Sequence, residues 1–230
     1  MAQQLPLDIH LRVDYRLDNF LTSSSQAREL VEKLADPALL EAGEAIVIYG
    51  ETGAGKTHLL QGLCQLAGDL GMRCSYLPLS QLKQANPAVL EGLEQLDLVC
   101  IDDIHSIAGN NEWERGLFNL FNLSRQSNCR LLMTSQQRPA DSFFKLADLT
   151  SRLDWGLVYA LPNLDQEQRK QLFQQRAIEL GLTVDEATCN YILQRQQRQT
   201  SNLMTFLDRL DHHSLAGQRR ITIPLVRELI

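Results

Sequence analysis

The chain has 230 residues, 44% hydrophobic and 22% charged, which is the balance of a globular protein with one large domain and room for a small appendage. A formal net charge of −6 argues against broad, non-specific binding to DNA phosphates, so we expect direct DNA contact to be weak at most. No apolar run approaches the ~20 residues that span a membrane, and the N-terminus lacks the apolar core of a signal peptide. These features predict a cytoplasmic protein that does not contact a membrane.

The N-terminal part of the chain is expected to contain a tail, a helix and a buried strand. Residues 1–15 are predicted to be a tail with little structure of their own. Residues 26–40 have the pattern of a helix, with the serines at 23–25 as candidate N-caps. The apolar run at 45–49 is typical of a buried parallel strand.

The stretch GETGAGKT, at 50–57, has the form G-x-x-x-x-G-K-T of a phosphate-binding loop. It lies between the predicted strand and a run of leucines at helical spacing, which is the context that this motif requires. We expect Lys56 to reach the β- and γ-phosphate oxygens and the Thr57 hydroxyl to ligate Mg²⁺. An ordinary strand-to-helix turn is the alternative, and three glycines followed by Lys-Thr disfavour it. The expected nucleotide-binding residues here are Gly50, Glu51, Thr52, Gly53, Ala54, Gly55, Lys56, Thr57 and His58.

An acidic strand end supports nucleotide binding. The apolar run at 96–101 ends in Asp102 and Asp103. In nucleotide-hydrolysing P-loop proteins an acid at such a strand end holds Mg²⁺, a role that we assign to Asp102, and Asp103 stands where a general base or water-orienting residue would lie. The alternative is that the two carboxylates cap the next turn.

Strands and helices alternate over the first 162 residues. The remaining expected strands lie at 73–79, 130–134 and 157–161, with helices at 88–93 and 112–127. This alternation predicts an α/β fold with a five-stranded parallel sheet flanked by helices. After Pro162 the pattern becomes helical, at 165–180, 185–195 and 202–217. The expected domains are a tail at 1–15, a nucleotide-binding core at 16–162 and a small C-terminal helical lid at 163–230.

Four segments, in this order, resemble the AAA+ ATPase module of the bacterial replication initiator DnaA. They are GETGAGKTHLLQGL, LVCIDDIH, LLMTSQQRP and SRLDWGLVYALP. The resemblance covers nearly the whole chain from Arg16 onward and implies an AAA+ P-loop core with a helical lid. The sequence departs from DnaA in three features. In these it resembles the regulators within the DnaA family that inactivate the initiator.

The first departure is that the sequence stops at Ile230, where DnaA continues into a helix-turn-helix domain. The second is that the segment between Leu79 and Leu98 holds one basic residue, whereas DnaA carries there a helix that contacts single-stranded DNA. The third is the N-terminal motif, which is similar to the short segment with which such regulators dock on the replicative sliding clamp. It consists of Gln4, Leu5, Pro6 and Leu7. Its leucines can enter an apolar pocket and its proline keeps the segment extended, while the alternative is a frayed terminus.

The resemblance also implies an arginine finger. Arg152, in SRLDWG, corresponds to the arginine that is supplied across a subunit interface and stabilises charge on a transferring phosphoryl group. The alternative is a structural salt bridge to Asp154 or Asp148.

Further pocket residues are implied in the same way. Leu17, Asp18 and Phe20 are expected to line the adenine site, and Tyr15 is a further candidate. The first sensor falls at Ser135 or Gln136. Ser201 stands where DnaA has its second-sensor arginine, and Arg198 lies one turn earlier.

Together these features predict a regulator that binds ADP with Mg²⁺ mainly as a signal and has weak or no ATPase activity of its own. Tethered to the sliding clamp, it would present Arg152 to ATP held by DnaA, which then hydrolyses that ATP and becomes inactive. One rival is a working ATPase such as a helicase loader, using Lys56, Asp102 and Asp103 for turnover. The other is a DNA-binding module. The sequence leaves self-association into a homo-oligomer open.

Overall fold

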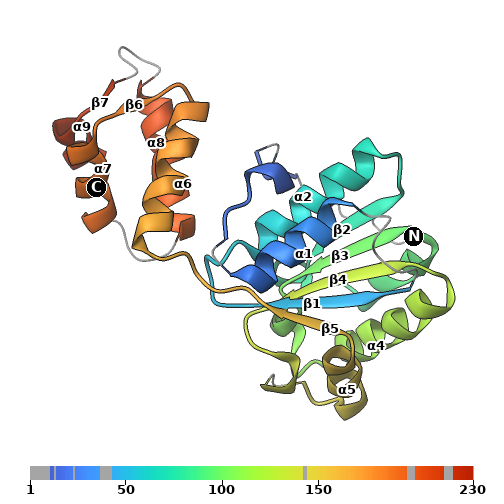
Figure 1. The fold of residues 1–230 in the computed structure, drawn as a ribbon. Helices are drawn as coiled ribbons and strands as arrows, with labels where there is room; N and C mark the ends of the chain where they lie inside the picture. The colour runs from blue at the N-terminus through green and yellow to red at the C-terminus, as the bar shows by residue number, and fades with distance from the viewer. Residues whose placement is uncertain are drawn as a thin grey trace, which may run out of the picture.

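The computed structural model describes residues 11–12, 14–22, 24–36, 43–141, 144–195, 200–214 and 220–229. These form an α/β core and a smaller lid that stands to one side of it, joined by the segment after the last strand of the core (Figure 1). No helix in these ranges is long and apolar enough to cross a membrane.

The core is built on a five-stranded parallel sheet with the order β2-β3-β4-β1-β5. Its strands are β1 (Ala45–Tyr49), β2 (Cys74–Pro78), β3 (Leu98–Asp102), β4 (Arg130–Ser135) and β5 (Leu157–Ala160). The predicted five-stranded parallel sheet is confirmed. Because the strands are parallel, the carboxyl ends of β1, β3 and β4 meet at one edge. The phosphate loop, the acidic pair and Ser135 therefore lie beside one another.

Helices cover both faces of this sheet (Figure 1). On one face, α1 (Ser25–Ala35) and α2 (Lys56–Asp69) pack on alternate strand residues such as Ile46, Ile48 and Cys100. On the other face, α4 (Asn111–Gln126) and α5 (Ala147–Trp155) pack on the residues between them, such as Val47 and Val99. The strands are consequently apolar on both sides, as a sheet between two helical layers requires.

Short helices connect these elements. They are η1 (Leu17–Asn19), α3 (Leu79–Leu82), η3 (Pro87–Leu90), η4 (Leu93–Gln95), η5 (Ile104–Ile107) and η6 (Pro139–Asp141). The single helix expected at 88–93 is wrong, because Gly92 adopts φ +80° and separates η3 from η4. The helix expected at 26–40 is described as far as Ala35, and residues 37–40 lie outside the described ranges.

The lid contains α6 (Gln166–Glu179), α7 (Glu186–Arg195), α8 (Thr200–Ser214) and α9 (Ile223–Leu229), with a two-stranded parallel sheet of β6 (Thr183–Val184) and β7 (Arg220–Ile221). Its apolar core is separate from that of the sheet and includes Phe173, Ile192, Leu207 and Val226. Three predicted helices are present. The sequence analysis missed α9 and the small sheet, because two-residue strands and a seven-residue helix are too short to produce a recognisable periodicity.

Candidate nucleotide-binding site

The phosphate loop is held tightly between two strand ends. The Gly50 N–H donates to the Ser135 carbonyl (3.2 Å), and a Cβ at Gly50 would lie 2.2 Å from the Leu161 carbonyl oxygen, so no larger residue fits. Gly53 and Gly55 adopt φ +89° and +96°, which L side chains rarely do. Gly55 is the N-cap of α2, so the loop leads directly into a helix N-terminus with its partial positive charge.

Lys56 lies at the centre of this loop. Its side chain is buried, and Nζ donates to the carbonyls of Gly50 (2.7 Å) and Glu51 (3.0 Å). Burial lowers the pKa of Lys56, while the charges of Asp103 and Asp102 act in the opposite direction. The Glu51 carboxylate points elsewhere and accepts a hydrogen bond from the Asn163 side chain (2.9 Å). Among the described residues, the hydrogen-bond partners of Nζ are thus neutral carbonyls, which is an arrangement that suits an incoming phosphate.

Asp102 is enclosed by hydroxyl groups. It is buried and accepts hydrogen bonds from Thr57 Oγ1 (2.7 Å), Tyr76 Oη (2.8 Å) and Thr134 Oγ1. The contact with Thr57 joins the two residues expected to bracket Mg²⁺. The sequence analysis missed Tyr76 and Thr134, because neither belongs to a motif. Burial and the Asp102 charge raise the pKa of Tyr76, which keeps this phenol a donor.

The rest of the phosphate end is formed by the segments that follow β3 and β4. Asp103 adopts the left-handed conformation (φ 59°) and lines the pocket. Gln136 also lines it, and its Nε2 donates to Thr52 Oγ1 (2.8 Å). Ser135 is fully buried and does not line the pocket, so Gln136 is the one of the two sensor candidates that reaches it.

His105 is a further pocket residue that the sequence analysis missed. Its Nδ1 accepts a hydrogen bond from the Gln136 N–H (3.3 Å) and lies 4.0 Å from an Asp103 oxygen. Burial lowers its pKa and the Asp103 charge acts against this, so a neutral ring suits the observed acceptor role. The signal available in the sequence was its position two residues after the acidic pair.

Aromatic rings form the other end of the pocket. Tyr15 stacks on His58 with ring centroids 4.7 Å apart and an angle of 6° between the planes, and Phe20 meets His58 edge-on at 5.4 Å. The His58 Nε2 lies 2.7 Å from the Arg16 carbonyl and 2.9 Å from Asn19 Oδ1. Flat apolar faces beside fixed polar groups are what a nucleobase requires.

Leu17 and Asp18 were expected beside the base but are not among the residues lining the pocket. The short helix η1 turns Leu17 into the apolar layer under α2 and leaves Asp18 exposed, 3.5 Å from Arg16 Nε. Phe20 and Tyr15 do line the pocket.

Two ion pairs join the lid to the segment before η1. Arg12 donates to Asp208 of α8 (2.9 Å), and Asp14 accepts from Arg176 of α6 (2.8 Å). We call residues 12–15 the strap, although Val13 itself lies outside the described ranges. The Arg12 backbone also bonds to the side chains of Gln61 and Gln65 on α2. The structure therefore places the last residues of the expected tail in contact with both core and lid.

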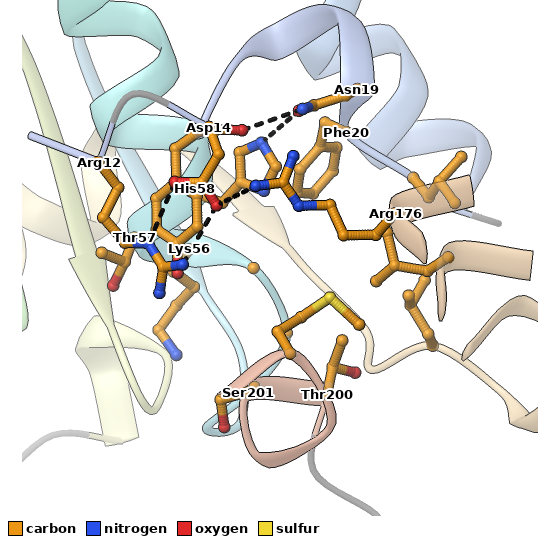
Figure 2. Close-up of a pocket in the computed structure, with 18 of the residues that line it drawn as sticks. Arg12, Asp14, Asn19, Phe20, Lys56, Thr57, His58, Arg176, Thr200 and Ser201 are labelled. Atoms are coloured by element: carbon orange, nitrogen blue, oxygen red, sulfur yellow. Dashed lines mark hydrogen bonds and ion pairs between the residues drawn. The ribbon is translucent and has the colours of Figure 1, made fainter. Parts of the chain in front are cut away.

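Lid residues complete the pocket wall. Figure 2 shows Asp14, His58 and Arg176 close together, with Thr200 and Ser201 of α8 across the pocket from them. Ser201, at the second-sensor position, thus lines the pocket with an uncharged side chain. Arg198 lies outside the described residues.

The pocket between core and lid has a volume of about 380 Å³, within the range of small-molecule sites. One end offers a buried lysine, a helix N-terminus and a Thr–Asp pair, and the other offers stacked rings. These residues fit a nucleotide with Mg²⁺.

Arg152 lies apart from this pocket. It is half-buried and does not line the pocket. Its helix, α5, lies at the end of the core remote from the lid (Figure 1). Among the described residues the side chain of Arg152 has no hydrogen-bond or ion-pair partner. Asp154, one expected alternative partner, instead accepts from Arg138 Nε (3.0 Å). Nearby, Trp155 is 67% exposed and Arg125 covers one face of its ring at 4.6 Å.

A phosphate loop, an acidic strand end, this strand order and a helical lid across the pocket define a P-loop protein of the AAA+ class. The family model of the bacterial DnaA ATPase domain matches residues 11–160, and that of the Hda lid domain matches residues 165–230. The chain therefore belongs to the DnaA family of AAA+ proteins.

Individual proteins agree with this. A protein of Haemophilus influenzae, described as uncharacterized, is 38% identical over 231 residues, covering 100% of this chain and 99% of its own. Domain III of Thermotoga maritima DnaA superposes with a TM-score of 0.78 at 21% identity, over 96% of this chain and 98% of its own. AMPPCP-bound DnaA from Aquifex aeolicus has a TM-score of 0.74 at 23% identity, over 90% and 68%. The two structures show that the fold is shared.

Proposed function

We propose that this protein is a negative regulator of replication initiation that stimulates ATP hydrolysis by DnaA through Arg152, supplied in trans. The observation that carries the proposal is the position of Arg152. It lies outside its own pocket, has no ionic partner among the described residues and stands near an exposed tryptophan. The alternative role, a structural salt bridge to Asp154, is disfavoured because Asp154 pairs with Arg138.

The pocket itself is proposed to hold ADP with Mg²⁺. Lys56 and the amides of the loop would bind the phosphates, Thr57 and Asp102 would hold the ion, and the rings of Tyr15, Phe20 and His58 would take the base. Bound Mg²⁺ neutralises phosphate charge. Ser201 is uncharged, and the lid arginine that lines the pocket, Arg176, is paired with Asp14 and Glu179. Among the described lid residues that line the pocket, no unpaired cation is therefore available to bind a terminal γ-phosphate, which supports a diphosphate used as a signal.

The tether is a separate part of the proposal. Gln4, Leu5, Pro6 and Leu7 lie outside the described residues, and their docking on the sliding clamp rests on the resemblance of the motif. Clamp docking would concentrate the protein on replicated DNA and raise the effective concentration of Arg152 near DnaA.

The test is to mix the protein, DNA-loaded sliding clamp and ATP-loaded DnaA and to follow phosphate release. Fingers supplied in trans raise rates by roughly 10³ to 10⁵ in well-studied cases. We expect Arg152→Ala to abolish the stimulation while ADP affinity and melting temperature stay unchanged. Arg152→Lys should fail almost as badly, because an ammonium does not reproduce the planar fork of donors.

Arg138→Ala is the matched control, since it removes a nearby arginine that is already paired with Asp154. If Arg152→Ala still stimulated DnaA at the normal rate, the finger assignment would be wrong. Appreciable steady-state hydrolysis by the protein without DnaA would instead favour a working ATPase.

A further inference from the structure

Glu114 is a buried acid that the proposed mechanism does not use. It lies in the first turn of α4 and is fully buried. Its two carboxylate oxygens accept four hydrogen bonds from three backbone amides. Oε1 accepts from Gly109 (2.6 Å) and Lys145 (3.1 Å), and Oε2 accepts from Lys145 (2.9 Å) and Leu146 (2.7 Å). A buried carboxylate is costly unless its oxygens are bonded in this way.

These amides belong to two segments that are distant in sequence and differ in role. Gly109, in the left-handed conformation (φ +87°), follows η5, which carries His105 and comes directly after Asp103. Hydrogen bonds from Ser106 to Asp103, from Ala108 to His105 and from Asn110 to Ile107 make the segment from Asp103 to Asn110 continuous. Its first residues line the nucleotide pocket, and its last amides lie beside Glu114.

The second segment starts the helix that carries Arg152. Lys145 immediately precedes Leu146, the N-cap residue of α5, whose leucine side chain cannot cap the helix. Glu114 therefore supplies from outside both the acceptors and the negative charge that a helix N-terminus favours. Arg152 lies on this helix, six residues after the N-cap.

We propose that Glu114 is a positioning residue that couples the nucleotide pocket to the helix of the arginine finger. The inference rests on the proposed function and names the connection through which the pocket acts on Arg152. Since Oε1 accepts from both Gly109 and Lys145, the carboxylate cannot keep both bonds if the loop after η5 and the start of α5 move apart. A shift in the position of Asp103 and His105 at the pocket thereby moves the backbone at the start of α5, which sets the direction of this helix.

Glu114→Gln is the informative variant. Gly109 bonds only to Oε1 and Leu146 only to Oε2, so whichever way the new amide faces, one of these N–H groups meets an NH₂ group and loses its acceptor. Glu112→Gln is the control. It makes the same chemical change two residues earlier, at an exposed position of α4.

Hydrogen exchange with and without ADP measures the coupling without any need for DnaA. In the wild-type protein, ADP should slow exchange at Gly109, Lys145 and Leu146 by similar factors and should slow it along 147–155. In Glu114→Gln, exchange at 145–155 should rise about tenfold, the effect of one lost buried hydrogen bond, and lose its response to ADP. ADP should still bind, and the kcat for stimulated hydrolysis by DnaA should fall while the KM for DnaA stays unchanged.

Two results would overturn the inference. One is a wild-type protein in which ADP protects Gly109 but leaves Lys145 and Leu146 unaffected, a measurement that does not depend on the variant folding. The other is a folded Glu114→Gln protein whose exchange at 145–155 still responds to ADP. If the exchange results appear as expected but the wild-type protein does not stimulate DnaA, the proposed function fails and the coupling stands.

Discussion

Lys56 shows most directly how single residues define the site. It is buried and bonded to two carbonyls, whose place the phosphate oxygens of a nucleotide would take. Lys56→Ala should weaken ADP binding by about 1.5–3 kcal/mol, the usual contribution of a charge-assisted hydrogen bond. Calorimetric titration with ADP measures this, with Lys83→Ala, at an exposed position outside the pocket, as control. Equal affinity of wild type and Lys56→Ala would show that the loop does not hold phosphate.

His58 should make stability depend on pH. Burial lowers its pKa below the usual 6.5, opposed by the Arg16 carbonyl and Asp14, while Arg176 and Arg12 lower it further. Below pH 6.5 the unfolded chain therefore binds a proton at this histidine before the folded chain does. The free energy of unfolding is therefore highest above this pH and falls as the solution is acidified. One such group contributes a slope of up to about 1.4 kcal/mol per pH unit.

The check is the free energy of unfolding of the wild-type protein and of His58→Gln between pH 7.5 and 5 (about the range over which histidine titrates). His58→Gln should have the shallower slope. His105 remains in both proteins, so its own contribution cancels. His213→Gln, at an exposed position on α8 outside the pocket, is the matched control variant. Equal slopes for the wild-type protein and His58→Gln would contradict the assignment.

At the scale of elements, the strap and the lid hold each other across the pocket. Burial alone would raise the pKa of Asp14, but the hydrogen bond from Arg12 and the charges of Arg12 and Arg176 outweigh it and lower that pKa. The Asp14–Arg176 pair is only about one quarter exposed on either side, so it is screened less than a surface pair.

A double-mutant cycle with Asp14→Asn and Arg176→Gln tests this contact. Each single change should weaken ADP binding, because the lid wall of the pocket is held less firmly. The double variant should be weakened by less than the sum, with a coupling of about 1 kcal/mol. Lys170→Gln, which breaks an ion pair to Glu186 within the lid, is the control and should leave ADP affinity unchanged. Strict additivity would mean that the two residues act separately.

At the scale of the whole molecule, the proposed clamp motif at 4–7 precedes in sequence the strap that lines the nucleotide pocket. The described contacts of this segment with the core begin at Leu11 and Arg12. Replacing Gln4, Leu5 and Leu7 together by alanine removes none of them. The variant should therefore lose clamp binding in a pull-down while keeping the wild-type melting curve. Gln3→Ala is the neighbouring control, and a triple variant that still bound the clamp would remove the tether from the proposal.

Much of the fold was predictable because its signals are local. The apolar runs of the five strands, the glycines of the phosphate loop and the acidic end of β3 are each contained within about ten residues, and their order predicted the parallel α/β sheet. The AAA+ fold and the DnaA family were implied by the resemblance of four short segments. The two-residue strands β6 and β7 and the helix α9 were missed, since so short an element has no period to detect.

The sequence by itself determined the class of fold, the family and the segment that forms the phosphate end of the pocket. Tertiary structure alone decided which residues distant in the sequence come into contact. Arg12 pairs with Asp208 across 196 positions, Tyr76 and Thr134 come to Asp102 from neighbouring strands, and Glu114 binds amides 31 and 32 residues away. The physical reason is that periodicity and motif spacing describe a residue's own element. The partner of a polar group is chosen by whatever the packed elements bring within hydrogen-bond distance.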